Sequence, residues 1–170
     1  MEFENKIISR EISVLLYEKG LTLGTAESCT GGRIAEAIIS TPGSSNYFKG
    51  GIISYVDEIK SRLLGVDSDL LAAEGAVCEE VARQMVCGAC AVLGVDYAIS
   101  STGFAGPGGG TPSAPVGTIW LACGSPDDIV TLKLTEDRGR DLNISMATER
   151  ALHLFFDFIQ SHQLSEQQID

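Results

Sequence analysis

Short strand-like segments alternate with helical patterns along most of this chain. Apolar residues recur three or four positions apart in the expected helices, whereas the expected strands are shorter apolar runs bounded by glycine, proline or polar residues. We predict helices over residues 3–16, 34–39, 57–65, 79–93 and 141–159, and strands over residues 21–27, 50–56, 97–102, 117–123 and 129–134. This alternation is typical of a layered α/β domain, and the short turn between the last two strands predicts an antiparallel pair.

The size and charge of the chain limit its class. Its 170 residues suffice for one core, so residues 1–170 are expected to form a single domain. The formal net charge of -11 disfavours nucleic acid and anionic membranes as partners, although a few amides and arginines can still hold one phosphate of a small molecule. The chain has five cysteines and no signal-peptide pattern, which predicts reduced thiols in a cytoplasmic protein. It has no long apolar run, so we expect no membrane span.

The first candidate site is AESCTGG, residues 26–32, which places Ser28 where a strand passes into a helix. Unpaired backbone amides at a helix start can bind an anion or a developing oxyanion, and glycines allow a substrate to approach the main chain. The alternative is that Ser28 and Thr30 only cap the helix. Cys29 is predicted to be a packing residue, because an unactivated buried cysteine is the commoner case.

The second candidate site is SYVDEIK, residues 54–60, at the end of a strand and the first turn of a helix. A cation in the first turn of a helix interacts unfavourably with the helix dipole, at a cost of about 0.3–1 kcal/mol. Lys60 therefore either binds an anionic ligand or takes part in catalysis, or it is a surface lysine whose charge is balanced by nearby carboxylates. His153 and His162 do not lie in suitable positions to activate a serine. A lysine or a tyrosine would therefore have to activate Ser28.

A glycine-rich stretch, residues 101–112, joins two predicted strands. A Rossmann or Walker phosphate loop must lead into a helix, so neither motif fits. Pro112 and Pro115 restrict the chain after the glycines, which favours an ordered wall of a binding site over a flexible connector.

Two pairs of residues have roles that the pattern leaves open. Cys87 and Cys90 have metal or redox spacing, but they lie in mid-helix without a second pair, so they are predicted to be core or surface thiols. Arg138 and Arg140 stand beside acidic residues. They either bind a phosphate or pair with neighbouring carboxylates.

Four ordered blocks resemble the C-terminal domain of the CinA competence/damage-inducible proteins. They are AESCTGG at 26–32, TPGSSNYFKGGIISY at 41–55 with Lys60 following, GAVCEEVA at 75–82 and STGFAGPGGGTPSAPVGTIW at 101–120. The resemblance implies a three-layer α/β/α sandwich with a mixed, mostly parallel sheet, usually dimeric. It also implies hydrolysis of nicotinamide mononucleotide to nicotinate mononucleotide and ammonia, with no metal and no cofactor.

Carried over by position, the resemblance implies Ser28, Tyr55 and Lys60 as catalytic residues. The residues expected to bind the substrate are Thr30, Gly31, Gly32, Thr102, Gly103, Ala105, Gly106, Arg138 and Arg140. The expected partners are a small-molecule nucleotide substrate and a second copy of the chain in a homodimer.

The chain departs from the family pattern at Asp57, where asparagine is common, at Cys78, where serine is common, and in EDRGR at 136–140. Asp57 bears on the chemistry, because a carboxylate near Lys60 favours the charged ammonium unless burial compensates.

Our mechanistic hypothesis is that Ser28 attacks the carboxamide while Tyr55 and Lys60 relay its proton. Backbone amides of residues 30–32 would stabilise the oxyanion. Alternatively, Lys60 stays charged and lowers the pKa of Tyr55. Two other functions compete with this one: a non-catalytic nucleotide-binding or regulatory module, and a serine hydrolase that acts on another small amide.

Overall fold

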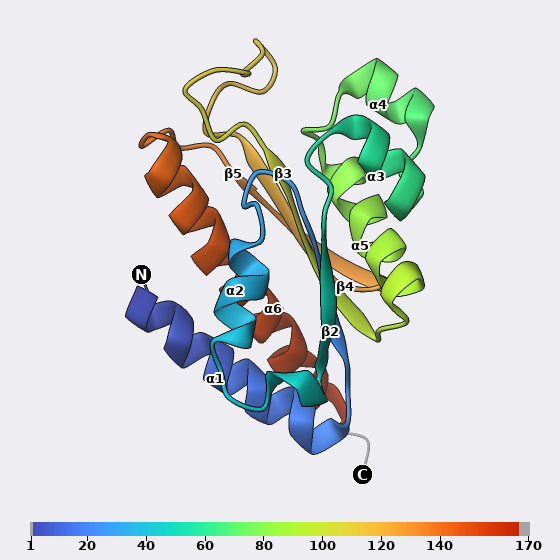
Figure 1. The fold of residues 1–170 in the computed structure, drawn as a ribbon, viewed down its shortest axis with the longest axis vertical. Helices are drawn as coiled ribbons and strands as arrows, with labels where there is room; N and C mark the ends of the chain where they lie inside the picture. The colour runs from blue at the N-terminus through green and yellow to red at the C-terminus, as the bar shows by residue number, and fades with distance from the viewer. Residues whose placement is uncertain (1, 167–170) are drawn as a thin grey trace.

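The computed structural model describes residues 2–166, with side chains for residues 3–162, as a five-stranded sheet between two layers of helices (Figure 1). The helices are α1 (Glu2–Lys19), α2 (Arg33–Ile39), α3 (Asp57–Leu64), α4 (Ser68–Glu74), α5 (Glu79–Leu93) and α6 (Arg140–Glu166). The strands are β1 (Leu23–Glu27), β2 (Phe48–Ile53), β3 (Tyr97–Gly103), β4 (Ile119–Ser125) and β5 (Asp128–Leu134). The predicted three-layer α/β/α sandwich is confirmed.

The strand order β2-β1-β3-β4-β5 combines a parallel half with an antiparallel half. β1 pairs in parallel with β2 and β3, whereas β4 runs antiparallel to both of its neighbours. Four of the five strands therefore run in one direction, and the predicted mixed sheet with its final antiparallel pair is confirmed. The carboxyl ends of β2, β1 and β3 meet at one edge, where Glu27 pairs with Ile53 and Ser101. Ligands of open α/β sheets bind at this kind of edge.

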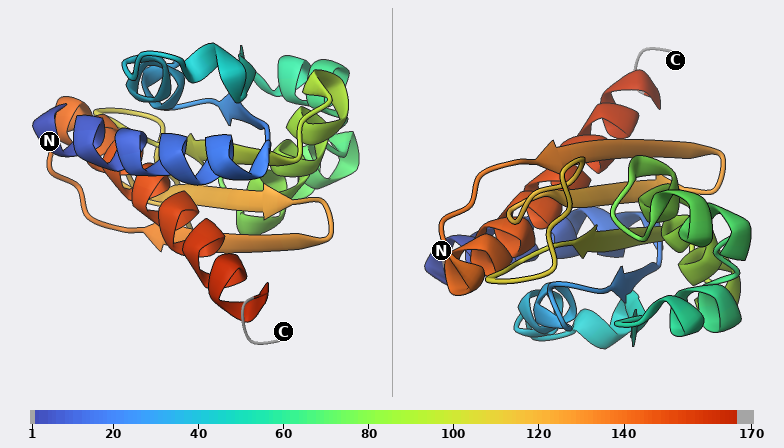
Figure 2. Two further views of the ribbon diagram at one scale, coloured as in Figure 1. Left: turned by 90° about the horizontal axis from the view of Figure 1, so that it is seen from below. Right: turned by 90° about the horizontal axis from the view of Figure 1, so that it is seen from above.

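Each face of the sheet has its own apolar core, because helices cover both faces. α1, α2 and α6 cover one face around Leu16, Ile34 and Phe155, and Figure 2 shows α1 and α6 lying side by side. α3, α4 and α5 cover the other face around Leu64 and Met85. No helix among the described residues is long and apolar enough to cross a membrane.

Two details differ from the sequence analysis. The strand predicted over residues 50–56 is β2, an edge strand that ends at Ile53 and alternates between half-buried and exposed residues. Tyr55 and Val56 therefore lie beyond the strand. The short helix α4 was not predicted, because its seven residues offer only two turns of apolar spacing.

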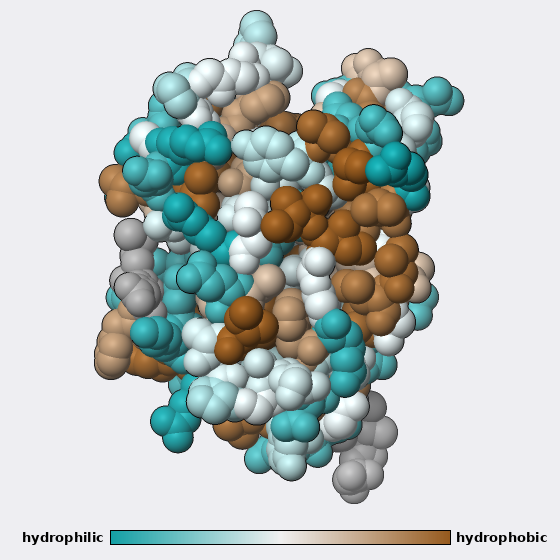
Figure 3. All heavy atoms as spheres, in the orientation of Figure 1, coloured by the Kyte–Doolittle hydropathy of each residue, from teal (hydrophilic) through white to brown (hydrophobic). Residues whose placement is uncertain are grey.

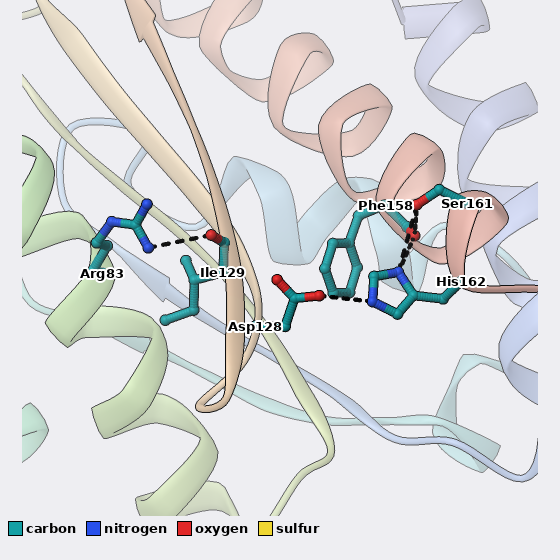
Figure 4. A network of polar contacts seen from close by, with 6 residues as sticks. All are labelled: Arg83, Asp128, Ile129, Phe158, Ser161 and His162. Carbon is teal, nitrogen blue, oxygen red and sulfur yellow. Dashed lines mark hydrogen bonds and ion pairs between the residues drawn. The ribbon is translucent and has the colours of Figure 1, made fainter. Parts of the chain in front are cut away.

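The hairpin between β4 and β5 is fastened to helices on both faces, at the end of the sheet away from the carboxyl ends of β1 and β3 (Figure 4). His162 on α6 bonds Asp128 through Nε2 at 2.8 Å and the Phe158 carbonyl through Nδ1 at 2.8 Å. Arg83 on α5 donates to the Ile129 carbonyl at 3.2 Å. His162 thus links α6 to the start of β5, and His153 is exposed on α6.

Candidate active site

Ser28 lies in the tight turn between β1 and α2. Its amide donates to the Ser101 carbonyl at 2.9 Å, and its carbonyl accepts from the Gly31 amide at 3.1 Å. Gly31 and Gly32 have φ values of 60° and 98°, which a residue with a Cβ rarely adopts, so the two glycines make this sharp turn possible. The Ser28 side chain is buried but reaches a cavity beyond the strand ends.

Lys60 lies in the first turns of α3 and points inward to Ser28. Its Nζ donates to Ser28 Oγ at 3.2 Å and to the Ser54 carbonyl at 2.9 Å, and only 1% of the residue is exposed. Burial lowers the pKa of Lys60, because the low-dielectric interior disfavours the ammonium. Asp57, whose Oδ1 lies 3.7 Å from Nζ, raises the pKa of Lys60, but burial is the larger effect.

Tyr55 and Arg140 meet on the other side of the same cavity. The Tyr55 hydroxyl accepts from an Arg140 Nη at 3.3 Å, and the second Nη of Arg140 donates to the Gly106 carbonyl at 2.8 Å. Tyr55 is 58% exposed. The hydrogen bonds found within residues 2–166 do not join its hydroxyl to Ser28 or Lys60, so the structure groups Tyr55 with Arg140.

The cavity, of about 410 Å³, collects segments that are far apart in the sequence. Its lining contains these residues expected from the sequence: Ser28, Tyr55, Lys60, Thr102, Gly103, Ala105, Gly106 and Arg140. Cys29, Asp57, the stretch 75–77, Phe104 and Gly108 complete it. The glycine-rich stretch thus forms one wall, as predicted.

Thr30, Gly31 and Gly32 do not line the cavity, and the Thr30 hydroxyl and the amides of the two glycines already have acceptors. The Gly32 amide donates to Glu27 Oε2 at 3.0 Å, and the Thr30 hydroxyl donates to the same oxygen at 2.7 Å. The Gly31 amide bonds the Ser28 carbonyl. The expectation that the amides of Gly31 and Gly32 face an oxyanion is therefore wrong in this structure, because a buried glutamate and the turn itself satisfy them.

The two arginines left open by the sequence have different surroundings. Arg140 faces the cavity, whereas Arg138 is exposed and pairs with Glu136 at 2.6 Å. Asn143, which the sequence analysis missed, is buried and holds this segment to the cavity wall. It accepts from the Arg138 amide at 2.8 Å and donates to the Ala105 carbonyl at 3.0 Å.

The cysteines match their predicted roles as packing or surface thiols. Burial raises the pKa of Cys29 to about 12, which disfavours the reactive thiolate beside Ser28. Cys87 and Cys90 are free thiols, and burial raises their pKa values too. Residues 2–166 contain no cluster of histidine, cysteine, aspartate or glutamate suited to a metal ion.

Comparison with known proteins gives one consistent result. The family model of the CinA C-terminal domain matches residues 5–159. A CinA-like protein of Leptospira borgpetersenii serovar Hardjo-bovis (strain L550) is 51% identical over 121 residues, which are 71% of this chain and 29% of that protein. A protein of Symbiobacterium thermophilum described as a putative competence-damage inducible protein is 50% identical over 119 residues, 70% of this chain and 28% of its own length. The chain thus spans less than a third of the length of these curated relatives.

Solved structures share the fold over nearly the whole chain. The competence/damage inducible protein CihA from Agrobacterium tumefaciens superposes with a TM-score of 0.87 at 33% identity, over 91% of this chain and 94% of that one. The competence damage-inducible protein A from Klebsiella pneumoniae superposes with a TM-score of 0.86 at 31% identity, over 90% of this chain and 95% of that one.

Proposed function

Because this chain belongs to the CinA C-terminal domain family, we propose that it is an amidohydrolase that converts nicotinamide mononucleotide to nicotinate mononucleotide and ammonia. The observation that carries the proposal is the buried contact of 3.2 Å between Lys60 Nζ and Ser28 Oγ inside a cavity of about 410 Å³. A serine needs an adjacent base to act as a nucleophile, and burial moves the pKa of Lys60 in the direction that a neutral amine base requires. The cavity volume is within the range of about 300–1,000 Å³ that small-molecule sites occupy.

In the proposed first step, neutral Lys60 takes the hydroxyl proton of Ser28 as Oγ bonds to the carboxamide carbon. The tetrahedral intermediate collapses when the C–N bond breaks, and Lys60 returns the proton to the leaving nitrogen, so that ammonia departs. We assign the oxyanion to the Cys29 amide, since the residue after a nucleophilic serine at a strand-to-helix turn supplies this donor in other hydrolases.

In the second step, Lys60 takes a proton from a water molecule that attacks the acyl carbon. The C–O bond to Ser28 breaks, the serine recovers its proton from Lys60, and nicotinate mononucleotide leaves. The enzyme is then restored without a metal or a cofactor.

Tyr55 and Arg140 hold the phosphorylated end of the substrate in this proposal. The guanidinium of Arg140 is a charge-assisted donor to phosphate, and its contact with the Gly106 carbonyl places it against the glycine-rich wall. The start of α2 does not take the phosphate in this scheme, because the Glu27 carboxylate already bonds the amides there.

We further propose that the protein acts in the cytoplasm as a homodimer. The exposed outer edge of β2 and several exposed apolar side chains lie on one face, over β2 and the neighbouring helices (Figure 3). The exposed apolar side chains of these elements include Ile53 at the end of β2, Val56 just after it, Leu63 on α3 and Val92 on α5. A contiguous apolar patch beside an exposed strand edge is typical of a protein–protein contact.

The direct test is ammonia release from nicotinamide mononucleotide by the purified protein. We expect turnover, and slower turnover of nicotinamide riboside, which lacks the phosphate. Turnover without any preference for the phosphate would support a hydrolase of another small amide. The competing non-catalytic module is favoured by the contact between Asp57 and Lys60, and no ammonia release from nicotinamide mononucleotide or from other small amides would favour it over a hydrolase.

A further inference from the structure

Glu27 is a buried carboxylate that the proposed reaction does not use. It ends β1 immediately before Ser28, and only 1% of it is exposed. Its two oxygens accept four hydrogen bonds, from the Thr30 hydroxyl and from the amides of Gly32, Ile34 and Ala35, at 2.7–3.1 Å. All four partners are donors to the carboxyl oxygens, so one side chain holds together the turn from Thr30 to the first turn of α2.

The main chain of Glu27 reaches the other half of the site. Its carbonyl accepts from the Ser54 amide at 2.8 Å, and the Ser54 carbonyl in turn accepts from Lys60 Nζ at 2.9 Å. Glu27 is thus bonded to the turn that carries Ser28 and to the segment that holds Lys60.

A second path of hydrogen bonds runs from the Glu27 side chain to Ser28 through β3. The Thr30 hydroxyl, bonded to Glu27, lies 2.6 Å from the Ser101 hydroxyl, and the Ser101 carbonyl accepts from the Ser28 amide at 2.9 Å. Each of these groups is buried, so loss of one partner leaves another unsatisfied.

We propose that Glu27 is a positioning residue, which acts through Ser28 by holding its Oγ in reach of Lys60. The expected effect on turnover rests on the proposed function. The hydrogen bonds from Glu27 would position Ser28 whichever substrate the protein uses. Misplacement of a reacting group by about 1 Å can cost on the order of 100-fold in rate. Glu27 is not among the residues that line the cavity, so we expect no contact between its side chain and the substrate.

The test uses Glu27→Gln, which keeps the shape of the side chain but replaces one acceptor oxygen by an NH₂ group that faces donors. We expect kcat for nicotinamide mononucleotide to fall about 10- to 100-fold while KM stays within about twofold, because substrate contacts are untouched. Asp67→Asn is the matched control, since Asp67 caps α4 through the Asp69 amide and lies away from the cavity. It should lower Tm slightly and leave kcat unchanged.

Thr30 supplies a second pair of variants should Glu27→Gln fail to fold. Thr30→Val removes the hydroxyl that links Glu27 to Ser101 and should lower kcat. Thr30→Ser keeps this hydroxyl and should therefore retain kcat. A folded Glu27→Gln protein, or a folded Thr30→Val protein, with the kcat of the wild type overturns the inference.

Labelling of Ser28 by a fluorophosphonate, followed by mass spectrometry, separates this inference from the proposed function. Wild-type labelling at Ser28 that slows in Glu27→Gln supports the positioning role even if the wild type releases no ammonia from the nucleotide. Equal labelling rates in the two proteins, or no labelling of wild-type Ser28, overturn it.

Discussion

Lys60 shows how burial and charge act against each other at a single residue. Its side chain is shielded from water beside Ser28, while Asp57 keeps a carboxylate at 3.7 Å. The Asp57 carboxylate opposes a neutral base at Lys60, and burial of the amine offsets this effect. The net result is a lowered pKa of Lys60.

Asp57→Asn should therefore move the acidic limb of the kcat/KM profile to lower pH. Asp57 raises the pKa of Lys60, so removing its charge lowers that pKa further, and Lys60 becomes neutral at a lower pH. The measurement is a steady-state pH profile, with Glu58→Gln as the control, because Glu58 is exposed and pairs with Arg62. An acidic limb that stays in place in Asp57→Asn would mean that this limb does not report Lys60.

Arg140→Ala should weaken the use of the phosphorylated substrate selectively. Loss of a charge-assisted hydrogen bond of about 1.5–3 kcal/mol lowers kcat/KM by roughly 10- to 100-fold. The loss should be much smaller for nicotinamide riboside, and Arg138→Ala should behave as the wild type because Arg138 pairs with Glu136 outside the cavity. Equal losses on both substrates would place the phosphate elsewhere.

Ser28 stood out in the sequence by its place in a glycine turn and Lys60 by its place at a helix start, and both residues line the cavity. Glu27 and Asn143 were missed because most of their partners are backbone groups, which carry no sequence signature. Catalysis by Ser28 and Lys60 stays a prediction that only kinetics can test, and the same holds for the catalytic role first expected of Tyr55, which we now propose to lie at the phosphate with Arg140.

At the scale of elements, the strands and the long helices could be predicted from the sequence, because the spacing of apolar residues indicates where they lie. α5 has the bounds predicted for it, Glu79–Leu93, and the final hairpin was expected from its short turn. The edge position of β2 was not predictable, because strand order depends on contacts between distant segments.

α3 and α5 pack so closely that Gly88 is required between them. A Cβ at Gly88 would lie 2.0 Å from the Leu64 carbonyl oxygen at the end of α3. Gly88→Ala should therefore destabilise the protein by about 1–3 kcal/mol, although alanine is the better helix former by about 1 kcal/mol. Ala91→Gly, on the exposed side of the same helix, should lower the stability only by the difference in helix propensity, about 1 kcal/mol.

Denaturant unfolding of both variants measures the difference. Because α3 carries Lys60, Gly88→Ala should also lower kcat. A Gly88→Ala protein that is more stable than the wild type would show that the two helices have room between them.

At the scale of the whole molecule, the apolar face over β2 accounts for the proposed homodimer (Figure 3). Ile53, the last residue of β2, is 54% exposed, so Ile53→Glu should convert a dimer to a monomer by burying a charge in the contact. Val14→Glu, on the exposed side of α1, should leave the dimer intact. Light scattering at micromolar concentration measures the mass, and a wild type that is monomeric there would contradict the proposal.

The proposed reaction depends on Ser28 as the nucleophile in the cavity at the carboxyl ends of β1, β2 and β3. The most direct measurement is the rate of ammonia release from nicotinamide mononucleotide by the wild type and by Ser28→Ala, with circular dichroism to establish that both are folded. The account predicts steady turnover by the wild type and a rate at background for Ser28→Ala. Turnover by a folded Ser28→Ala protein at the wild-type rate would contradict it.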